Sequence, residues 1–162
     1  MTRKQITIYT DGSCLNNGKT DSYGGWAAIL SYCDKKQQIH RKEYCGGKVG
    51  TTNNRMELAA IIGGISKLIV PCDITVVTDS KYAINVLSKV PDFAKNEWHY
   101  PCGTGNPLNL EQLKTFWQIL SEGKHTIKFQ YIKSHDGNPE NEHADALAKA
   151  EARAMKKVKV LA

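Results

Sequence analysis

The stretch TDGSCLNNG, residues 10–18, is the part of the sequence around which the chain is organised. It follows an alternating apolar run that contains Ile6 and Ile8, a pattern that predicts a β-strand ending at Thr10 in a turn of small and polar residues. The Asp11 carboxylate can then point out of the end of a sheet. Asp before Gly also suits ordinary turn chemistry, so Asp11 is a candidate only in combination with other acids.

The composition fits one globular domain over residues 1–162. Of the 162 residues, 41% are hydrophobic and 23% are charged, which is enough for a proper core. No apolar run is long enough to span a bilayer, and the first residues, MTRKQITIYTDG, lack the apolar core of a signal peptide. These features predict an intracellular, cytoplasmic protein without a membrane partner.

Basic residues outnumber acidic ones, 22 to 16, and the net charge of +6 favours a polyanionic partner. The local positive clusters at 35–36, 41–42 and 156–159 suit solvated faces equally well. The five cysteines are odd in number, widely spaced and without a CxxC pair. They predict reduced thiols, and neither a disulfide framework nor a zinc site.

The first half of the chain reads as sheet and then changes to helix at Thr52. Residues 26–32 and 38–45 are β-prone and are joined by a short polar turn, which predicts an antiparallel meander with the first strand. A helical stripe ending before Pro71 follows: Leu58, Ile61, Ile62, Ile65, Leu68 and Ile69.

Glu57 falls on the border of that stripe and can face a site at the rim of the sheet. The spacing from Asn54 to Glu57 also fits a capping box, in which Glu57 only ties back to the start of the helix. The residues themselves leave both roles open.

Residues 73–78 read as a buried strand, and Asp79-Ser80-Lys81 leads into a second helix at about 82–87. Strand, helix and strand imply a parallel crossover, which places Asp79 at the carboxyl end of a central strand, where sites of α/β proteins collect. Either Asp79 or Ser80 can cap the helix.

The segment 89–109 is rich in proline, glycine and aromatic residues, and is either a functional protrusion or a long connection. A helix over 110–120 and a strand over 127–131 follow. A loop that contains His135 then leads to a last helix capped by Asn138, with Pro139 at its first position and a flexible tail at about 156–162. Asn141 and Asp145, four residues apart, lie along one edge of its buried face.

Four acids therefore share a placement at strand ends or on the shoulders of helices: Asp11, Glu57, Asp79 and Asp145. If they converge, their repulsion is tolerable only with bound cations or raised pKa values. Ligation by oxygen alone suits Mg²⁺ or Mn²⁺. Two such ions can activate a water and stabilise the leaving oxygen of an in-line phosphoryl displacement.

The sequence resembles the type 1 ribonuclease H family in four blocks, each with its expected acid: TDGSCLNNG, TTNNRMELAA, VVTDSKYA and SHDGNPENEHADALA. The resemblance covers nearly the entire chain and implies an α/β, ribonuclease H-like fold: a five-stranded mixed sheet with helices on both faces. It further implies a stand-alone, monomeric catalytic domain that cuts the RNA strand of RNA-DNA hybrids endonucleolytically. The products carry 3′-hydroxyl and 5′-phosphate ends.

By this resemblance, the four acids hold two Mg²⁺ ions and His135 assists proton transfer or product departure. Gly12, Ser13 and Cys14 lie along the RNA, and Glu57 also meets a 2′-hydroxyl. The remaining substrate contacts implied are Asn17, Thr52 and Asn53 on the DNA strand, together with Asn54, Lys81 and Asn141.

The segment 89–109 departs from the basic handle of many bacterial relatives. It has only Lys89 and Lys95, offset by two acids. We therefore expect hybrid binding that is weaker and less sensitive to salt, since fewer phosphate contacts release fewer counterions.

Two alternatives remain: a DNA-cutting nuclease of the same fold, such as a resolvase or integrase, and a catalytically silent hybrid-binding module. The first generally lacks the TNNRMEL block and the His135 loop, and the second usually lacks an acid.

Overall fold

The computed structural model, which describes residues 3–100 and 107–161, is built on a five-stranded mixed sheet of order β3-β2-β1-β4-β5. β1 (Lys4–Leu15), β2 (Tyr23–Cys33) and β3 (Ile39–Val49) form an antiparallel meander. β4 (Cys72–Thr78) is parallel to β1, and β5 (Thr126–Tyr131) is parallel to β4. This topology confirms the predicted fold class.

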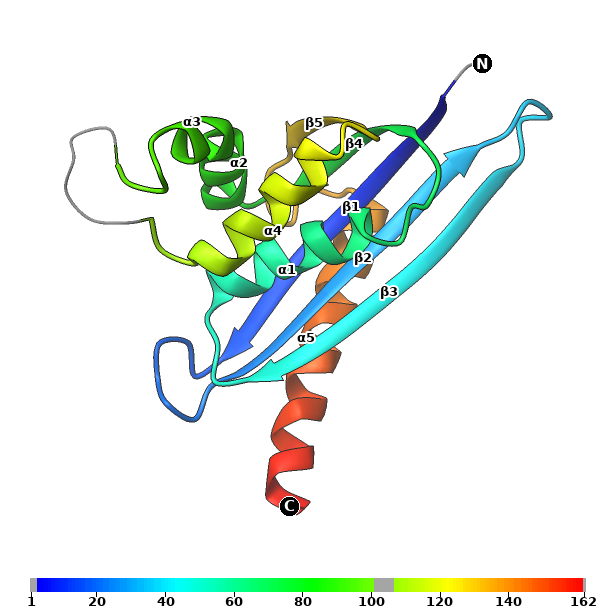
Figure 1. The fold of residues 1–162 in the computed structure, drawn as a ribbon. Coiled ribbons are helices and arrows are strands. Elements are labelled where there is room, and N and C mark those ends of the chain that lie inside the picture. Colours follow the sequence, from blue (N-terminus) through cyan, green and yellow to red (C-terminus); the bar gives the residue numbers. More distant parts are fainter. Residues whose placement is uncertain (1–2, 101–106, 162) are drawn as a thin grey trace.

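Helices cover both faces of the sheet (Figure 1). On one face lie α1 (Asn53–Ile65), α2 (Lys81–Ser88), α3 (Val90–Lys95) and α4 (Leu110–Ser121). α5 (Pro139–Leu161) crosses the other face and packs on β1 and β2. Among the described helices, none has the length and apolar character that a membrane span requires.

The core has two parts, one on each face. Between the sheet and the helices α1 and α4, the side chains of Ile8, Leu58 and Phe116 are completely or almost completely buried. Beneath α5, Ala27 and Ile29 of β2 meet small residues of the helix, Ala144 and Ala148. Since successive residues of a strand point to opposite faces, β1 and β2 contribute to both parts.

The predicted end of the first strand at Thr10 is wrong. β1 continues through Asp11 to Leu15, where it pairs with β2, and the turn falls after it. Asp11 lies opposite Ala27, inside the ladder. Turn-prone residues therefore form strand here because a partner strand supplies their hydrogen bonds.

The bounds of α1 also differ from the prediction. Its N-cap is Thr52, whose hydroxyl accepts a hydrogen bond from the Arg55 N–H at 3.2 Å, so Asn54 is not the cap. The helix ends at Ile65, and Ile69 beyond it is 82% exposed. The predicted apolar stripe extends past the end of the helix because Leu68 and Ile69 continue its spacing in the loop after Ile65.

Two other segments are more regular than expected. The region 89–109 contains α3, whose Val90 and Phe93 are buried against the core, while residues 101–106 lie outside the described part. The last helix continues to Leu161, so most of the segment expected to be a flexible tail is helical.

Candidate metal centre

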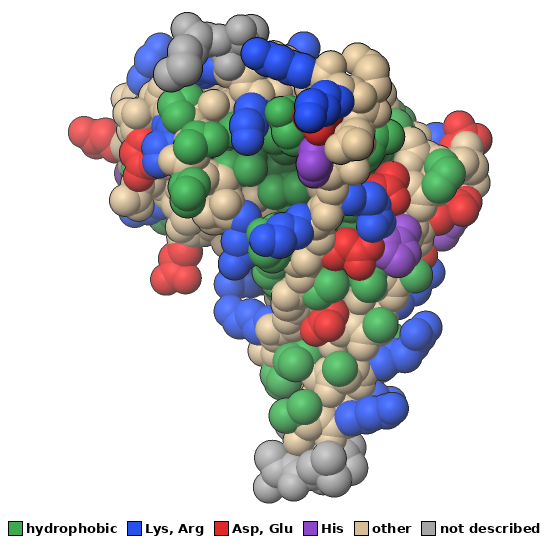
Figure 2. Space-filling view, turned by 90° about the vertical axis from the view of Figure 1, so that its right-hand side faces the viewer, with side chains coloured by type: hydrophobic (Ala, Val, Ile, Leu, Met, Phe, Trp, Pro, Cys, Tyr) green, Lys and Arg blue, Asp and Glu red, His purple; other side chains and the backbone are tan. Residues whose placement is uncertain are grey.

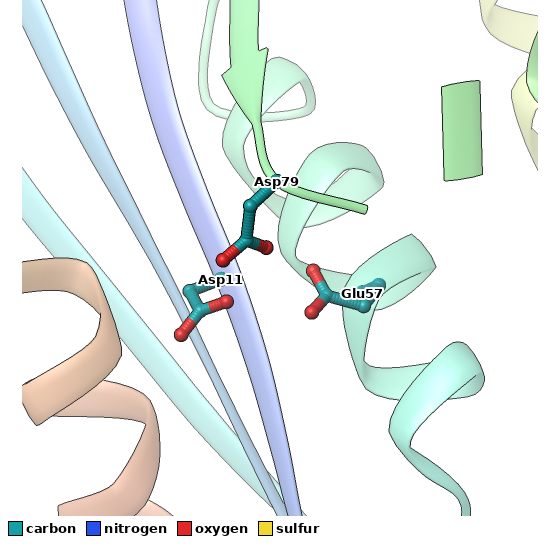
Figure 3. A group of neighbouring side chains, drawn as sticks. All are labelled: Asp11, Glu57 and Asp79. Carbon is teal, nitrogen blue, oxygen red and sulfur yellow. The ribbon is translucent and has the colours of Figure 1, made fainter. Parts of the chain in front are cut away.

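Three of the predicted acids converge in space. Asp11, Glu57 and Asp79 each offer a carboxylate oxygen, and these oxygens all lie within 4.8 Å of one another (Figure 3). The pairing of β4 with β1 stops at Val77 and Tyr9. Asp79, just past the end of β4, therefore leaves the sheet beside Asp11, and α1 supplies Glu57 from the side.

Gly12 explains how α1 comes so close to β1. A Cβ atom on Gly12 would overlap the backbone of Met56 and Glu57, so only glycine permits this contact. The Gly12 N–H donates a hydrogen bond to the Glu57 carboxylate. Glu57 therefore faces the cluster and does not close a capping box.

Asp79 is likewise free of a capping role. Ser80 is the N-cap of α2, and its hydroxyl accepts a hydrogen bond from the Ala83 N–H at 3.1 Å. The Ser80 N–H in turn donates to the Thr78 hydroxyl at 3.1 Å. Of the two caps that the sequence left open, the structure uses Ser80, and the Asp79 carboxylate turns toward the other acids.

The crowded carboxylates have strongly perturbed pKa values. Burial, followed by the negative charges of Glu57 and Asp79, raises the pKa of Asp11 to about 10. Burial, followed by the charge of Asp79, raises the pKa of Glu57 to about 8, although the Gly12 N–H opposes this rise. The buried Glu57 Oε2 has no hydrogen-bond partner within the described residues. Without a cation, the cluster therefore retains protons at neutral pH.

Asp145 lies beside this cluster and not inside it. It reaches Asp11 from α5, on the opposite face from α1, and accepts a hydrogen bond from the Asp11 carboxyl. Lys149 donates a second one at 2.9 Å. Burial acts to raise the pKa of Asp145, but these two hydrogen bonds and the charge of His135 outweigh it, so this pKa lies below its usual value.

His135 is an exposed residue of the loop before α5, and its backbone is left-handed, with a φ of 55°. Its effect on the pKa of Asp145 puts it near the acids. Asn138 caps α5, as predicted, by accepting a hydrogen bond from the Asn141 N–H at 3.0 Å. Asn141 itself is only 3% exposed.

An open groove of about 600 Å³ lies between the β1–β2 turn, the start of α1 and α2. It brings together predicted substrate contacts that are separated in sequence: Asn17, Thr52, Asn53 and Asn54. The Asn17 side-chain oxygen accepts a hydrogen bond from the Asn53 N–H at 2.9 Å, which joins the turn to the helix. The sequence reading missed other residues that line the groove: Arg55, Tyr82, Leu108 and Asn109. Of these residues, Arg55 could have been predicted from the sequence, because it lies inside the TTNNRMELAA block.

The other predicted contacts are spread around the acids. Ser13 and Cys14 continue along β1, and the Cys14 thiol lies 3.6 Å from the carbonyl oxygens of Leu15 and Thr51. Burial raises the pKa of this thiol. Lys81 is exposed at the start of α2, with its ammonium 5.2 Å from the centre of the Tyr131 ring.

The family model for RNase H matches residues 3–153. The chain belongs to the ribonuclease H family. Ribonuclease H of Oleidesulfovibrio alaskensis is 39% identical over 153 residues, which are 92% of this chain and 91% of that relative. Ribonuclease H of Rhizobium meliloti is 38% identical over 159 residues, 96% of this chain and 95% of that one.

Solved structures agree with this assignment. LC9-RNase H1, described as a type 1 RNase H with the type 2 active-site motif, superposes with a TM-score of 0.82 at 26% identity, over 96% of this chain and 75% of that one. A foamy viral protease-reverse transcriptase in complex with an RNA/DNA hybrid superposes with a TM-score of 0.72, over 93% of this chain and 20% of that one. At 16% identity, the second likeness shows the ribonuclease H fold alone.

Proposed function

We propose that this member of the ribonuclease H family is an endonuclease that hydrolyses the RNA strand of RNA-DNA hybrids. The observation that carries this proposal is the cluster of Asp11, Glu57 and Asp79, whose oxygens lie within 4.8 Å of one another. Such crowding costs free energy unless cations occupy the cluster. The family match over residues 3–153 supports the choice of substrate and a single ribonuclease H domain over residues 1–162.

Asp11, Glu57 and Asp79 would hold the divalent cations, and Asp145 would join them on release from Lys149. An all-oxygen donor set suits Mg²⁺, with Mn²⁺ as a substitute, and two such ions per site fit the number of acids. Bound ions of this kind activate a water and stabilise the leaving 3′-oxygen. The products then have 3′-hydroxyl and 5′-phosphate ends.

This chain's own residues would orient the substrate and move protons. The backbone of Gly12, Ser13 and Cys14 would follow the RNA strand, where Glu57 also meets a 2′-hydroxyl. A protein distinguishes RNA from DNA mainly at that hydroxyl. The exposed position of His135 near Asp145 supports a part in proton transfer or product departure.

The groove between the β1–β2 turn, α1 and α2 supports contact with the DNA strand. Asn17, Thr52 and Asn53 line it together with Asn54, and short polar side chains at a helix start suit phosphate and sugar oxygens. Lys81 would add a phosphate contact. Because Asn141 is buried, we propose that it acts only after a local rearrangement of α5.

We further propose that the protein acts as a monomer in the cytoplasm. The free thiols among the described cysteines support a reducing compartment. Sedimentation of the protein with and without a hybrid would test the monomeric state.

A cleavage assay with Mg²⁺ and matched duplexes of RNA-DNA, RNA-RNA and DNA-DNA would test the activity. We expect cutting of the RNA strand of the hybrid alone. Asp79→Asn removes charge without volume and should abolish cutting while hybrid binding persists. Cutting of the DNA duplex would indicate a resolvase-like nuclease, and hybrid binding without cutting would indicate a silent binding module.

A further inference from the structure

A second groove runs between the edge strand β3 and helix α1. Successive β3 residues point to opposite faces: Arg41 and Glu43 reach α5 on one side. Lys42, Tyr44 and Lys48 alternate with them on the side of the sheet that α1 covers, where Tyr44 packs against the core and Lys48 lines a hollow together with residues of α1. Two separate hollows lie along it, one of about 450 Å³ beside Trp26 and Lys48 and one of about 180 Å³ beside Tyr32 and Lys42, and Tyr44 lies on the stretch of β3 between them.

Aromatic rings form the floor of this groove. The Trp26 indole lies between Gly46 of β3 and Gly63 of α1, and a Cβ atom on either glycine would overlap it. Farther along, the partly buried rings of Tyr44 and Tyr32 pack against the core. The two glycines therefore leave room for the Trp26 ring within the groove.

Cations lie along the rim. The Lys67 ammonium is 5.1 Å from the centre of the Tyr44 ring, and the Lys4 ammonium is 5.0 Å from that of Tyr32. Figure 2 shows Lys and Arg side chains around an apolar hollow on this side of the molecule. Five basic residues adjoin the groove, and within the described residues none of them makes an ion pair with an acid: Lys4, Lys42, Lys48, Arg55 and Lys67.

Acids are fewer here. Glu111 lines one end, and Asp34, near the other end, is already paired with His40 at 2.8 Å. The groove is therefore positively charged overall. Aromatic rings interleaved with lysines along a groove are the arrangement with which proteins bind single-stranded nucleic acid, since bases stack on the rings and cations track the phosphates.

We propose that this groove binds single-stranded DNA that extends the DNA strand of a bound hybrid. Arg55 lines both this groove and the groove of Asn17, Thr52 and Asn53. A DNA strand that leaves the groove of Asn17 can therefore enter the groove along β3. The choice of DNA rests on the proposed function, which assigns Thr52 and Asn53 to the DNA strand.

The test measures binding to Asp79→Asn protein by fluorescence anisotropy in Mg²⁺. The probes are a blunt hybrid, the same hybrid with a thymidine extension at either end of the DNA strand, and one with a uridine extension on the RNA strand. One of the DNA extensions should tighten binding about tenfold, equivalent to stacking of one or two bases. Adding Lys42→Glu and Lys48→Glu should remove this gain. Adding Lys128→Glu, on the edge strand β5 at the other side of the sheet, should preserve it.

Cleavage of the blunt hybrid by the Lys42→Glu, Lys48→Glu variant, with Asp79 intact, should equal that of the wild type. No gain from either DNA extension, or an equal gain in both charge variants, would overturn the proposal. An equal gain from the RNA extension would overturn the choice of DNA, and stronger competition by polyglutamate than by oligothymidine would point to a protein partner. Failure of the proposed function appears separately, as an uncut blunt hybrid with wild-type protein.

Discussion

Arg41 of β3 holds Glu140, in the first turn of α5, by two hydrogen bonds: Nε to Oε2 at 2.6 Å and Nη2 to Oε1 at 3.0 Å. Arg41 also pairs with Glu43, which contacts His143 of α5 at 2.6 Å. The outer strand of the meander is thus tied to the start of the helix that carries Asp145. Because Glu140 and His143 lie within five residues of Asp145, we expect these contacts at the edge of the sheet to help hold Asp145 beside Asp11.

Arg41→Ala should therefore lower kcat several-fold while KM for the hybrid stays nearly constant, because α5 loses its tie and Asp145 is held less well. Because exposed ion pairs contribute little to the stability of a fold, the Tm of Arg41→Ala should fall by about 3 °C or less. Arg41→Lys, which keeps the charge but cannot form both hydrogen bonds to Glu140, should have a kcat between those of the wild type and Arg41→Ala. Steady-state kinetics and thermal melts would measure this. A raised KM with unchanged kcat would assign Arg41 to substrate binding instead.

Lys149→Gln should lower the Mg²⁺ concentration for half-maximal activity about two- to fivefold, as expected for removal of a partly exposed ion pair. The reason is that Lys149 competes with cations for Asp145. Lys156→Gln removes the same charge farther along α5 and serves as the control. Titrations of activity with Mg²⁺ would measure this. A higher Mg²⁺ concentration for half-maximal activity in Lys149→Gln would show that Lys149 favours metal binding instead of competing with it.

Without metal, the protein should become less stable as pH rises from about 4 to about 10. The folded state keeps protons on Asp11 and Glu57, whose pKa values are raised to about 10 and about 8, whereas the unfolded chain releases them near pH 4. Asp79→Asn removes one of the charges responsible and should flatten this decline. Urea unfolding at several pH values in EDTA would measure it, with Asp92→Asn as the control. A steeper decline in Asp79→Asn would contradict the assigned electrostatics.

Gly12→Ala should displace α1 from β1, because the new methyl group meets the backbone of Met56 and Glu57. Overpacking of this kind destabilises a fold by about 1 to 3 kcal/mol. The loss of activity should exceed the loss of folded protein, since Glu57 moves with the helix. Ser13→Ala, one residue on, should leave both nearly unchanged. An active Gly12→Ala enzyme with normal stability would show that α1 can adapt.

His135→Ala should slow turnover by about ten- to a hundredfold without abolishing it, since proton transfer by a side chain contributes on this scale. His135→Asn is the matched variant because Asn tolerates the left-handed backbone that His135 adopts. Both should fold as the wild type does. Single-turnover and steady-state rates would separate chemistry from product departure, and complete loss of activity would mean a different role.

Periodicity and topology rules predicted the antiparallel meander and the parallel crossover that the structure shows. They also placed Glu57 and Asp79 at the rim of the sheet, because both residues sit next to strong helix and strand patterns, and the structure brings these two acids together with Asp11. Local turn chemistry misplaced the end of β1, since the pairing of Ser13 and Cys14 with β2 is a tertiary effect. The ion pair of Asp145 with Lys149 follows simple helical spacing. Whether Asp145 pairs with Lys149 or binds a metal ion depends on the distance from Asp145 to the other acids. A local sequence pattern does not contain that distance.

Asp11, Glu57 and Asp79 come from a strand, a helix on one face and the end of another strand. An ion bound to all three would cross-link segments that are distant in the chain, and it would bind the folded state alone. Every increase in its concentration would then slow local opening of the sheet edge and raise resistance to proteolysis. The same three carboxylates would make the lifetime of the enzyme depend on the divalent ion supply of the cell.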